Sequence, residues 1–291
     1  MAGEREVDEA TQTATTGHEW DGIKELDTPM PRWWLWTFYA TIVWGVVYVI
    51  LYPAWPLVHG ATPGVLGYSS RATVQREVDA VRAAQAPLDA ELLATPIDQV
   101  AQNPELERFA IAGGGAVFRN NCMQCHGAGG QGAIGGFPAL VDDDWLWGGT
   151  LADIQQTVTH GIRYEADADT RFSQMPAFGE LLEPAQIDDL VQYVSMISGQ
   201  QHDSAMAESG RQLFLDNCSS CHGEDGKGSH EFGAANLTDA IWLYGGDPAT
   251  LRHTIQYARF GIMPSFSLGN RLRPEDIAKV AIYVHSLGGG Q

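Results

Sequence analysis

The chain has 291 residues, 44% of them hydrophobic, so it can form two small packed domains and a further segment. Its formal net charge is −19, from 17 Lys and Arg against 36 Asp and Glu. That balance argues against a nucleic-acid partner, which requires a basic surface, and favours basic protein partners.

Residues 33–55 read WWLWTFYATIVWGVVYVILYPAW and carry no charged side chain. About 20 apolar residues suffice for a helix to cross a bilayer, and terminal Trp and Tyr are typical of membrane interfaces. A buried helix is rarely so rich in terminal Trp. A cleaved signal peptide would have a shorter apolar core after a short basic segment. We therefore predict a retained transmembrane helix at residues 32–56.

The basic residues around this helix predict its orientation. Lys24 and Arg32 lie on its N-terminal side, whereas the first basic residue on the other side is Arg71. Because Lys and Arg close to a membrane helix stay on the cytoplasmic side, we expect residues 1–31 inside and residues from about 60 onward outside.

Residues 57–104 are predicted to be a connector. It begins with a turn-rich segment, and residues 71–86 have the spacing and mixed charge of a helix that Pro87 interrupts. Pro96 and Pro104 mark further breaks before the next domain.

Two related stretches follow the connector. FRNNCMQCHGAGGQG in the first corresponds to FLDNCSSCHGEDGKG in the second, with Cys122 and Cys218 96 residues apart. DDWLWGG and MPAFG recur as DAIWLYGG and MPSF, and each stretch ends in a segment of helical spacing. No run of alternating apolar residues is long enough to indicate a sheet. We therefore predict an all-α protein with two copies of one domain, at residues 105–200 and 205–291.

All four cysteines belong to two C-x-x-C-H motifs, the signature of covalent haem c attachment. Residues three apart share one face of a helix, so both thiols can bond one haem while the adjacent histidine binds its iron. A zinc site requires a second ligand pair, a thioredoxin-like motif requires a βαβ setting, and a disulfide leaves both histidines unexplained. We therefore predict two covalently bound haem c groups. The predicted residues are Cys122, Cys125 and His126 in the first domain and Cys218, Cys221 and His222 in the second.

The second axial ligand of each iron is predicted to be a methionine of the repeated Met-Pro segment. Met175 and Met263 occupy this position, each before a proline that fixes the backbone. His–Met ligation is typical of electron carriers, and with both axial positions filled the iron exchanges single electrons without binding oxygen. Trp145 and Trp242 are expected to pack near the haems or in the core. The rival ligands do not recur between the domains; they are His160, His230, His253 and His285.

On these residues the chain resembles the P-subunit family (CcoP or FixP) of cbb3-type cytochrome c oxidases, over nearly its whole length. The most specific segments are the one before the membrane helix and the stretch LVDDDWLWGG (140–149). The matching segments are DGIKELDTPMPRWW (21–34), GYSSR (67–71), NNCMQCHGAGGQGA (120–133), GFPALVDDDWLWGG (136–149), HGIR (160–163) and QMPAFG (174–179).

The resemblance implies one transmembrane helix followed by two tandem class I cytochrome c domains in the periplasm of a bacterial inner membrane. Electrons would pass from a donor cytochrome c over the two haems to a monohaem cytochrome c subunit. They would then reach a haem–copper catalytic subunit, which reduces oxygen and pumps protons. Catalysis would belong to the complex. By motif match, Met175 would serve the haem at Cys122, and Met263 the haem at Cys218.

Three other functions stay open at this point. A dihaem subunit of a membrane-bound dehydrogenase would have the same haem sites, and only the flanking segments favour the oxidase. A dihaem peroxidase would need one iron with an open or displaceable ligand. An adhesion ectodomain stabilised by disulfides or metal would contain no haem.

Overall fold

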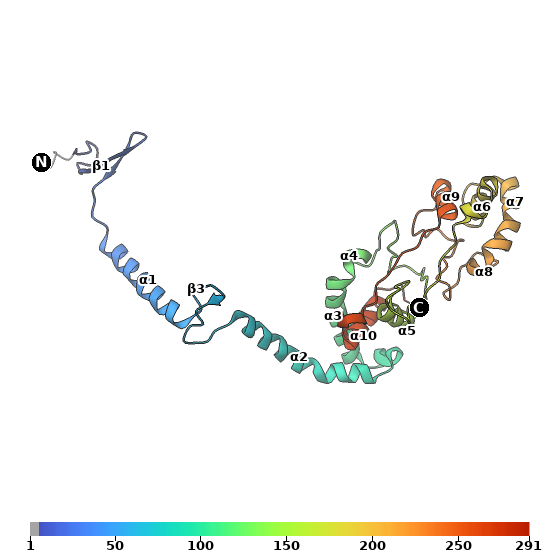
Figure 1. Ribbon diagram of the computed structural model, residues 1–291, viewed down its shortest axis with the longest axis horizontal. Coiled ribbons are helices and arrows are strands. Elements are labelled where there is room, and N and C mark those ends of the chain that lie inside the picture. The colour runs from blue at the N-terminus through green and yellow to red at the C-terminus, as the bar shows by residue number, and fades with distance from the viewer. Residues whose placement is uncertain (1–5, 291) are drawn as a thin grey trace. The chain divides into compact units, whose positions relative to one another are not determined.

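The computed structural model describes residues 6–290, which form two compact units divided between Ala84 and Gln85 (Figure 1). Residues 1–5 of the predicted cytoplasmic segment, and the last residue of the second predicted domain, lie outside the described residues. Most regular structure is helical, and the strands are few and short, so the predicted fold class is confirmed.

Unit 1 begins with an antiparallel hairpin that the apolar pattern does not predict. Its strands are β1, Thr15–Trp20, and β2, Ile23–Leu26. The two turn residues, Asp21 and Gly22, have positive φ angles of 51° and 86°. Asp-Gly is a favoured sequence for such two-residue turns, so this dipeptide is the sequence signal of the hairpin.

Helix α1, Arg32–Leu51, contains 20 residues and, within the described part of the chain, is the one helix long and apolar enough to cross a membrane. At 1.5 Å per residue it is about 30 Å long, which matches the hydrocarbon core of a bilayer. It ends before Tyr52, whose backbone is extended because a residue preceding proline disfavours the helical conformation. A second short hairpin follows, formed by β3, Pro56–Leu57, and β4, Gly60–Ala61.

Helix α2, Ser70–Ala94, is longer than predicted because it continues through Pro87. Leu92 is buried in a core cluster of unit 2, and Leu88 packs against the same cluster. A proline inside a helix costs roughly 3 kcal/mol, and we attribute the continuation to this apolar packing.

The other helices belong to unit 2. They are η1 Ile97–Gln102, α3 Pro104–Asn121, α4 Met123–His126, α5 Leu151–His160, η2 Phe178–Glu180, α6 Pro184–Ile197, α7 Ser204–Asn217, α8 Ser219–His222, α9 Pro248–Tyr257, η3 Leu268–Asn270 and α10 Pro274–His285.

These helices pack into two lobes. Lobe A consists of α3, α4, α5 and α10, and lobe B consists of α6, α7, α8 and α9. Helix α3 packs along α10, and α7 packs along α6, so each lobe combines the first helix of one repeat with the last helix of the other (Figure 1). The terminal helices of the two predicted domains, at 105–200 and 205–291, are thus exchanged in the packing, and the domain bounds themselves stay a prediction. The reason for the exchange is the short connection at residues 198–203, which folds α6 back antiparallel to α7 and leaves α3 to pair with α10.

The chain therefore passes between the lobes twice within unit 2, once after α5 and once after α9. The two passing segments meet at Ile162 and Met263. The Ile162 N–H donates to the Met263 carbonyl at 2.9 Å, and the Met263 N–H donates to the Ile162 carbonyl at 3.0 Å. This pair of hydrogen bonds brings Met263 of the second repeat into lobe A.

Candidate haem-binding sites

Each Cys-x-x-Cys-His motif begins at a break between two helices. Helices α3 and α7 end at Asn121 and Asn217, and the following cysteine keeps a helical backbone but starts a separate short helix. Burial raises the pKa of the first thiol of each motif, in Cys122 and Cys218, to about 11. All four thiols are free in the structure, so they are available for thioether bonds.

The two motif histidines are held alike. His126 Nδ1 lies 3.0 Å from the Pro138 carbonyl oxygen, and His222 Nδ1 lies 2.9 Å from that of Ala235. Burial lowers the pKa of both imidazoles, so they are neutral near pH 7. A neutral ring that donates from Nδ1 presents the Nε2 lone pair, which is the form that binds a metal.

The structure assigns the two methionines to the lobes in the opposite way to the motif match. Met175 packs against the apolar core of lobe B, as does Cys218. Met263 packs against the core of lobe A, which contains Cys122. The packing therefore favours the opposite pairing to the expected one of Met175 with the first haem and Met263 with the second, and the assignment of the ligands stays a prediction. Each methionine loop directly precedes the last helix of its own repeat, α6 or α10, in the chain. The loop therefore packs in the lobe to which that helix belongs.

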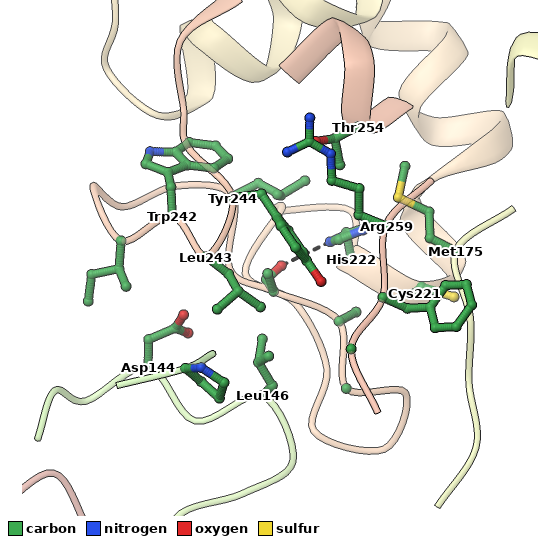
Figure 2. Close-up of a pocket in the computed structure, with 18 of the residues that line it drawn as sticks. Asp144, Leu146, Met175, Cys221, His222, Trp242, Leu243, Tyr244, Thr254 and Arg259 are labelled. Atoms are coloured by element: carbon green, nitrogen blue, oxygen red, sulfur yellow. Dashed lines mark hydrogen bonds between the residues drawn. The ribbon is translucent and has the colours of Figure 1, made fainter. Parts of the chain in front are cut away.

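A cavity of about 390 Å³ lies around the second motif. Figure 2 shows Met175, Cys221 and His222 at this cavity, together with Asp144 and Leu146 of the first repeat. Much of its lining is apolar, and four charged side chains also reach it, those of Asp142, Asp144, Arg163 and Arg259. The groups that could bind a haem are two thiols, an imidazole and a thioether. This donor set matches haem c, which needs two thioether bonds, an imidazole, a thioether ligand and a dry apolar pocket. Apolar lining residues include Phe178, Leu190, Val194, Phe214, Leu251 and Ile255.

The predicted tryptophans pack against the same cores. Trp145 packs against the lobe A core, and Trp242 packs against the lobe B core and lines the cavity. Two of the rival histidines have other partners in the structure. His160 Nδ1 lies 3.2 Å from the carboxylate of the buried Asp167, and the His253 ring packs 4.8 Å from that of Tyr257.

Three further residues reach this region that the motif comparison does not single out. Arg163, Tyr244 and Arg259 all line the cavity. The Arg259 guanidinium carbon lies 5.4 Å from the centroid of the Tyr244 ring. Their positions depend on the chain passing between the lobes. Of the three, only Arg163 lies in a segment that carries the family resemblance, HGIR (160–163).

The helical lobes and the Cys-x-x-Cys-His sites define a c-type cytochrome with a membrane-spanning N-terminal helix. Family models agree over most of the chain. The model for the N-terminal domain of cytochrome oxidase-cbb3, FixP, matches residues 12–59, and that for cytochrome c oxidase, cbb3-type, subunit III matches residues 109–194 and 205–284. The chain belongs to the family of subunit III of cbb3-type cytochrome c oxidases.

Curated relatives cover nearly the full length. The cbb3-type cytochrome c oxidase subunit CcoP of Cereibacter sphaeroides is 56% identical over 279 residues, which are 95% of each chain. The corresponding subunit of Rhodobacter capsulatus is 55% identical over 289 residues, 96% of this chain and 97% of the relative. Subunit FixP of Azorhizobium caulinodans is 52% identical over 286 residues, 98% of this chain and 96% of the relative.

Proposed function

We propose that this chain is the dihaem electron-transfer subunit of a cbb3-type cytochrome c oxidase. The observation that carries the proposal is the presence, in each lobe, of one Cys-x-x-Cys-His motif and one methionine packed against the same core. A donor cytochrome c supplies the electrons. They leave to a monohaem cytochrome c subunit and then to the haem–copper subunit, where oxygen is reduced and protons are pumped.

The two haem c groups supply reversible one-electron chemistry when bound. Cys122 and Cys125 would hold one of them, and His126 and Met263 would bind its iron. Cys218, Cys221, His222 and Met175 would hold the other in the same way. Ligation by the methionine sulfur would raise the reduction potential, and the carbonyl partners of the two Nδ1 atoms fix the imidazole orientation.

The proposed topology follows the basic residues that flank α1. Lys24 and Arg32 keep the N-terminal segment in the cytoplasm, and the haem lobes stand in the periplasm of the inner membrane. With the lobes on the outer face of the membrane, their haem sites are within reach of a donor cytochrome c.

The test is a mild-detergent pull-down of the full chain from its native membrane, followed by oxygen uptake with reduced cytochrome c. Cyanide-sensitive uptake, with b-type haem in the eluate, is the expected result. Recovery of c-type haem without oxygen uptake, but with substrate-driven reductase activity, would transfer the chain to a membrane dehydrogenase. A haem stain after denaturing electrophoresis checks covalent attachment, and a negative stain would contradict both functions.

A further inference from the structure

Two aromatic side chains make reciprocal contacts where lobe A meets lobe B. Trp147, in the loop between α4 and α5, lies against Gly233 of the loop between α8 and α9: a Cβ atom at position 233 would come within 2.1 Å of the Trp147 ring. Tyr244 of the second loop lies against Gly136 of the first, where an added Cβ would be 3.2 Å from the Tyr244 ring. The Gly135 N–H also donates to the Leu243 carbonyl at 2.9 Å.

Each ring touches the loop that orients the iron-binding histidine of the other lobe. Gly233 is two residues before Ala235, whose carbonyl oxygen is the partner of His222 Nδ1. Gly136 precedes Pro138, the partner of His126, by the same interval. Each aromatic ring is therefore connected, through a stretch of three residues, to the opposite histidine site.

Trp147 is held more firmly than Tyr244. Its side chain is 8% exposed, and the guanidinium carbons of Arg163 and Arg171 each lie 5.3 Å from its ring centroid. Arg171 also donates to the Trp147 carbonyl at 2.7 Å, and Arg163 donates to the Gly261 carbonyl at 3.1 Å. Arg163 lies on the segment that leaves lobe A, and Gly261 lies on the segment that returns to it. The hydrogen bond between them therefore joins the two segments that connect the lobes.

We infer that Trp147 is a positioning residue for electron exchange between the two haem sites. Its ring fixes the Gly233 loop of lobe B against lobe A, and thereby sets the separation across which the electron passes. The exchange oxidises one site and reduces the other by one electron, and no bond or proton changes place. This inference rests on the proposed function, because it requires one redox group in each lobe.

The test uses the full chain with both haems attached, in detergent. Two quantities are measured: the rate of electron redistribution after flash reduction, and the magnetic coupling between the two ferric haems by pulsed electron paramagnetic resonance. Trp147→Leu is expected to slow redistribution several-fold and weaken the coupling, while haem content and the His–Met absorption of each site stay unchanged. Trp147→Phe, which retains a ring in the contact, should remain close to the unmodified protein.

Gly233→Ala tests the same contact from lobe B, because the added methyl group must displace the Trp147 ring. Trp20→Leu is the matched control, since Trp20 is exposed in β1 and belongs to unit 1. Unchanged redistribution in both Trp147→Leu and Gly233→Ala would overturn the inference. So would a loss of rate that accompanies loss of methionine ligation in both, because Trp147 would then only support the fold. Absence of two redox-active haems in the unmodified chain would instead contradict the proposed function.

Discussion

Gly114 in α3 lies directly on the backbone of Lys279 in α10, where a Cβ atom at position 114 would be 2.1 Å from the Lys279 carbonyl oxygen. The same relationship recurs in lobe B, where a Cβ at Gly210 would be 2.2 Å from the carbonyl oxygen of Asp189. In both lobes a glycine permits close approach between helices of different repeats. These two glycines therefore mark the helix exchange.

Gly114→Ala is expected to lower the free energy of unfolding by roughly 2 kcal/mol. Overpacking against a backbone atom costs more than the helix propensity of Ala contributes, which is about 1 kcal/mol. The measurement is thermal or denaturant unfolding of the haem-loaded chain. Gly113→Ala is the control, because the three atoms nearest to its added Cβ all belong to the Lys279 side chain, the closest at 2.8 Å, and none to the backbone. Equal stability of the two variants would contradict the close backbone contact.

The exchanged methionine ligation can be tested in a chain that carries one haem. Cys218→Ser with Cys221→Ser removes the second attachment site and leaves the haem of lobe A. Adding Met263→Ala should then abolish the near-infrared band of methionine-ligated ferric haem and lower the reduction potential, because the sixth ligand is lost. Adding Met175→Ala to the same background should leave the band and the potential unchanged.

The opposite outcome would restore the pairing within each sequence repeat. In that case Met175→Ala, and not Met263→Ala, would abolish the methionine band of the first haem. A parallel series in a Cys122→Ser, Cys125→Ser background tests the second haem, and there the roles of the two methionines are expected to be reversed.

Removing one partner of the buried Lys279–Asp89 ion pair should destabilise the packing of residues 85–94 of α2 within unit 2. Nζ and Oδ1 are 2.5 Å apart, and Lys279 is 4% exposed. Asp89 Oδ1 makes no aligned hydrogen bond, so charge attraction dominates the contact. Asp89→Leu alone strands a buried cation and is expected to cost about 3 kcal/mol. In the double variant with Lys279→Met most of this loss should disappear; full additivity of the two single losses would argue against the pair.

Asp144 predicts a pH dependence of stability. Burial, with repulsion from Asp239 and neighbouring carboxylates, raises its pKa from 3.8 to about 6. The folded state binds this proton more tightly than the unfolded state, so stability falls as pH rises from about 4 to about 6. Asp144→Asn removes the ionisation and should stabilise the chain above pH 6 by roughly 2 kcal/mol after allowance for partial exposure, with no gain near pH 3. Unfolding curves across this range check the sign, and a constant difference at every pH would count against it.

Much of the chain could be predicted from local sequence. The charge-free run before Trp55 determines a membrane-length helix, because its apolar length is set by the bilayer and does not depend on the rest of the fold. The two Cys-x-x-Cys-His motifs predict haem attachment sites in the same way, since the two thiols and the histidine that a haem c needs lie within one helical turn.

Other features were decided by tertiary structure alone. A duplication shows which residues are equivalent, but it does not show which copies pack together, so Met175 and Met263 could be named as ligands but not assigned to a lobe. That assignment depends on the short connection between α6 and α7, on helix approach at Gly114 and Gly210, and on contacts between residues far apart in the chain. Continuation of α2 through Pro87 and the position of Trp147 between the lobes have the same origin. In each case the free energy of long-range packing determines the result, and a single stretch of sequence does not contain it.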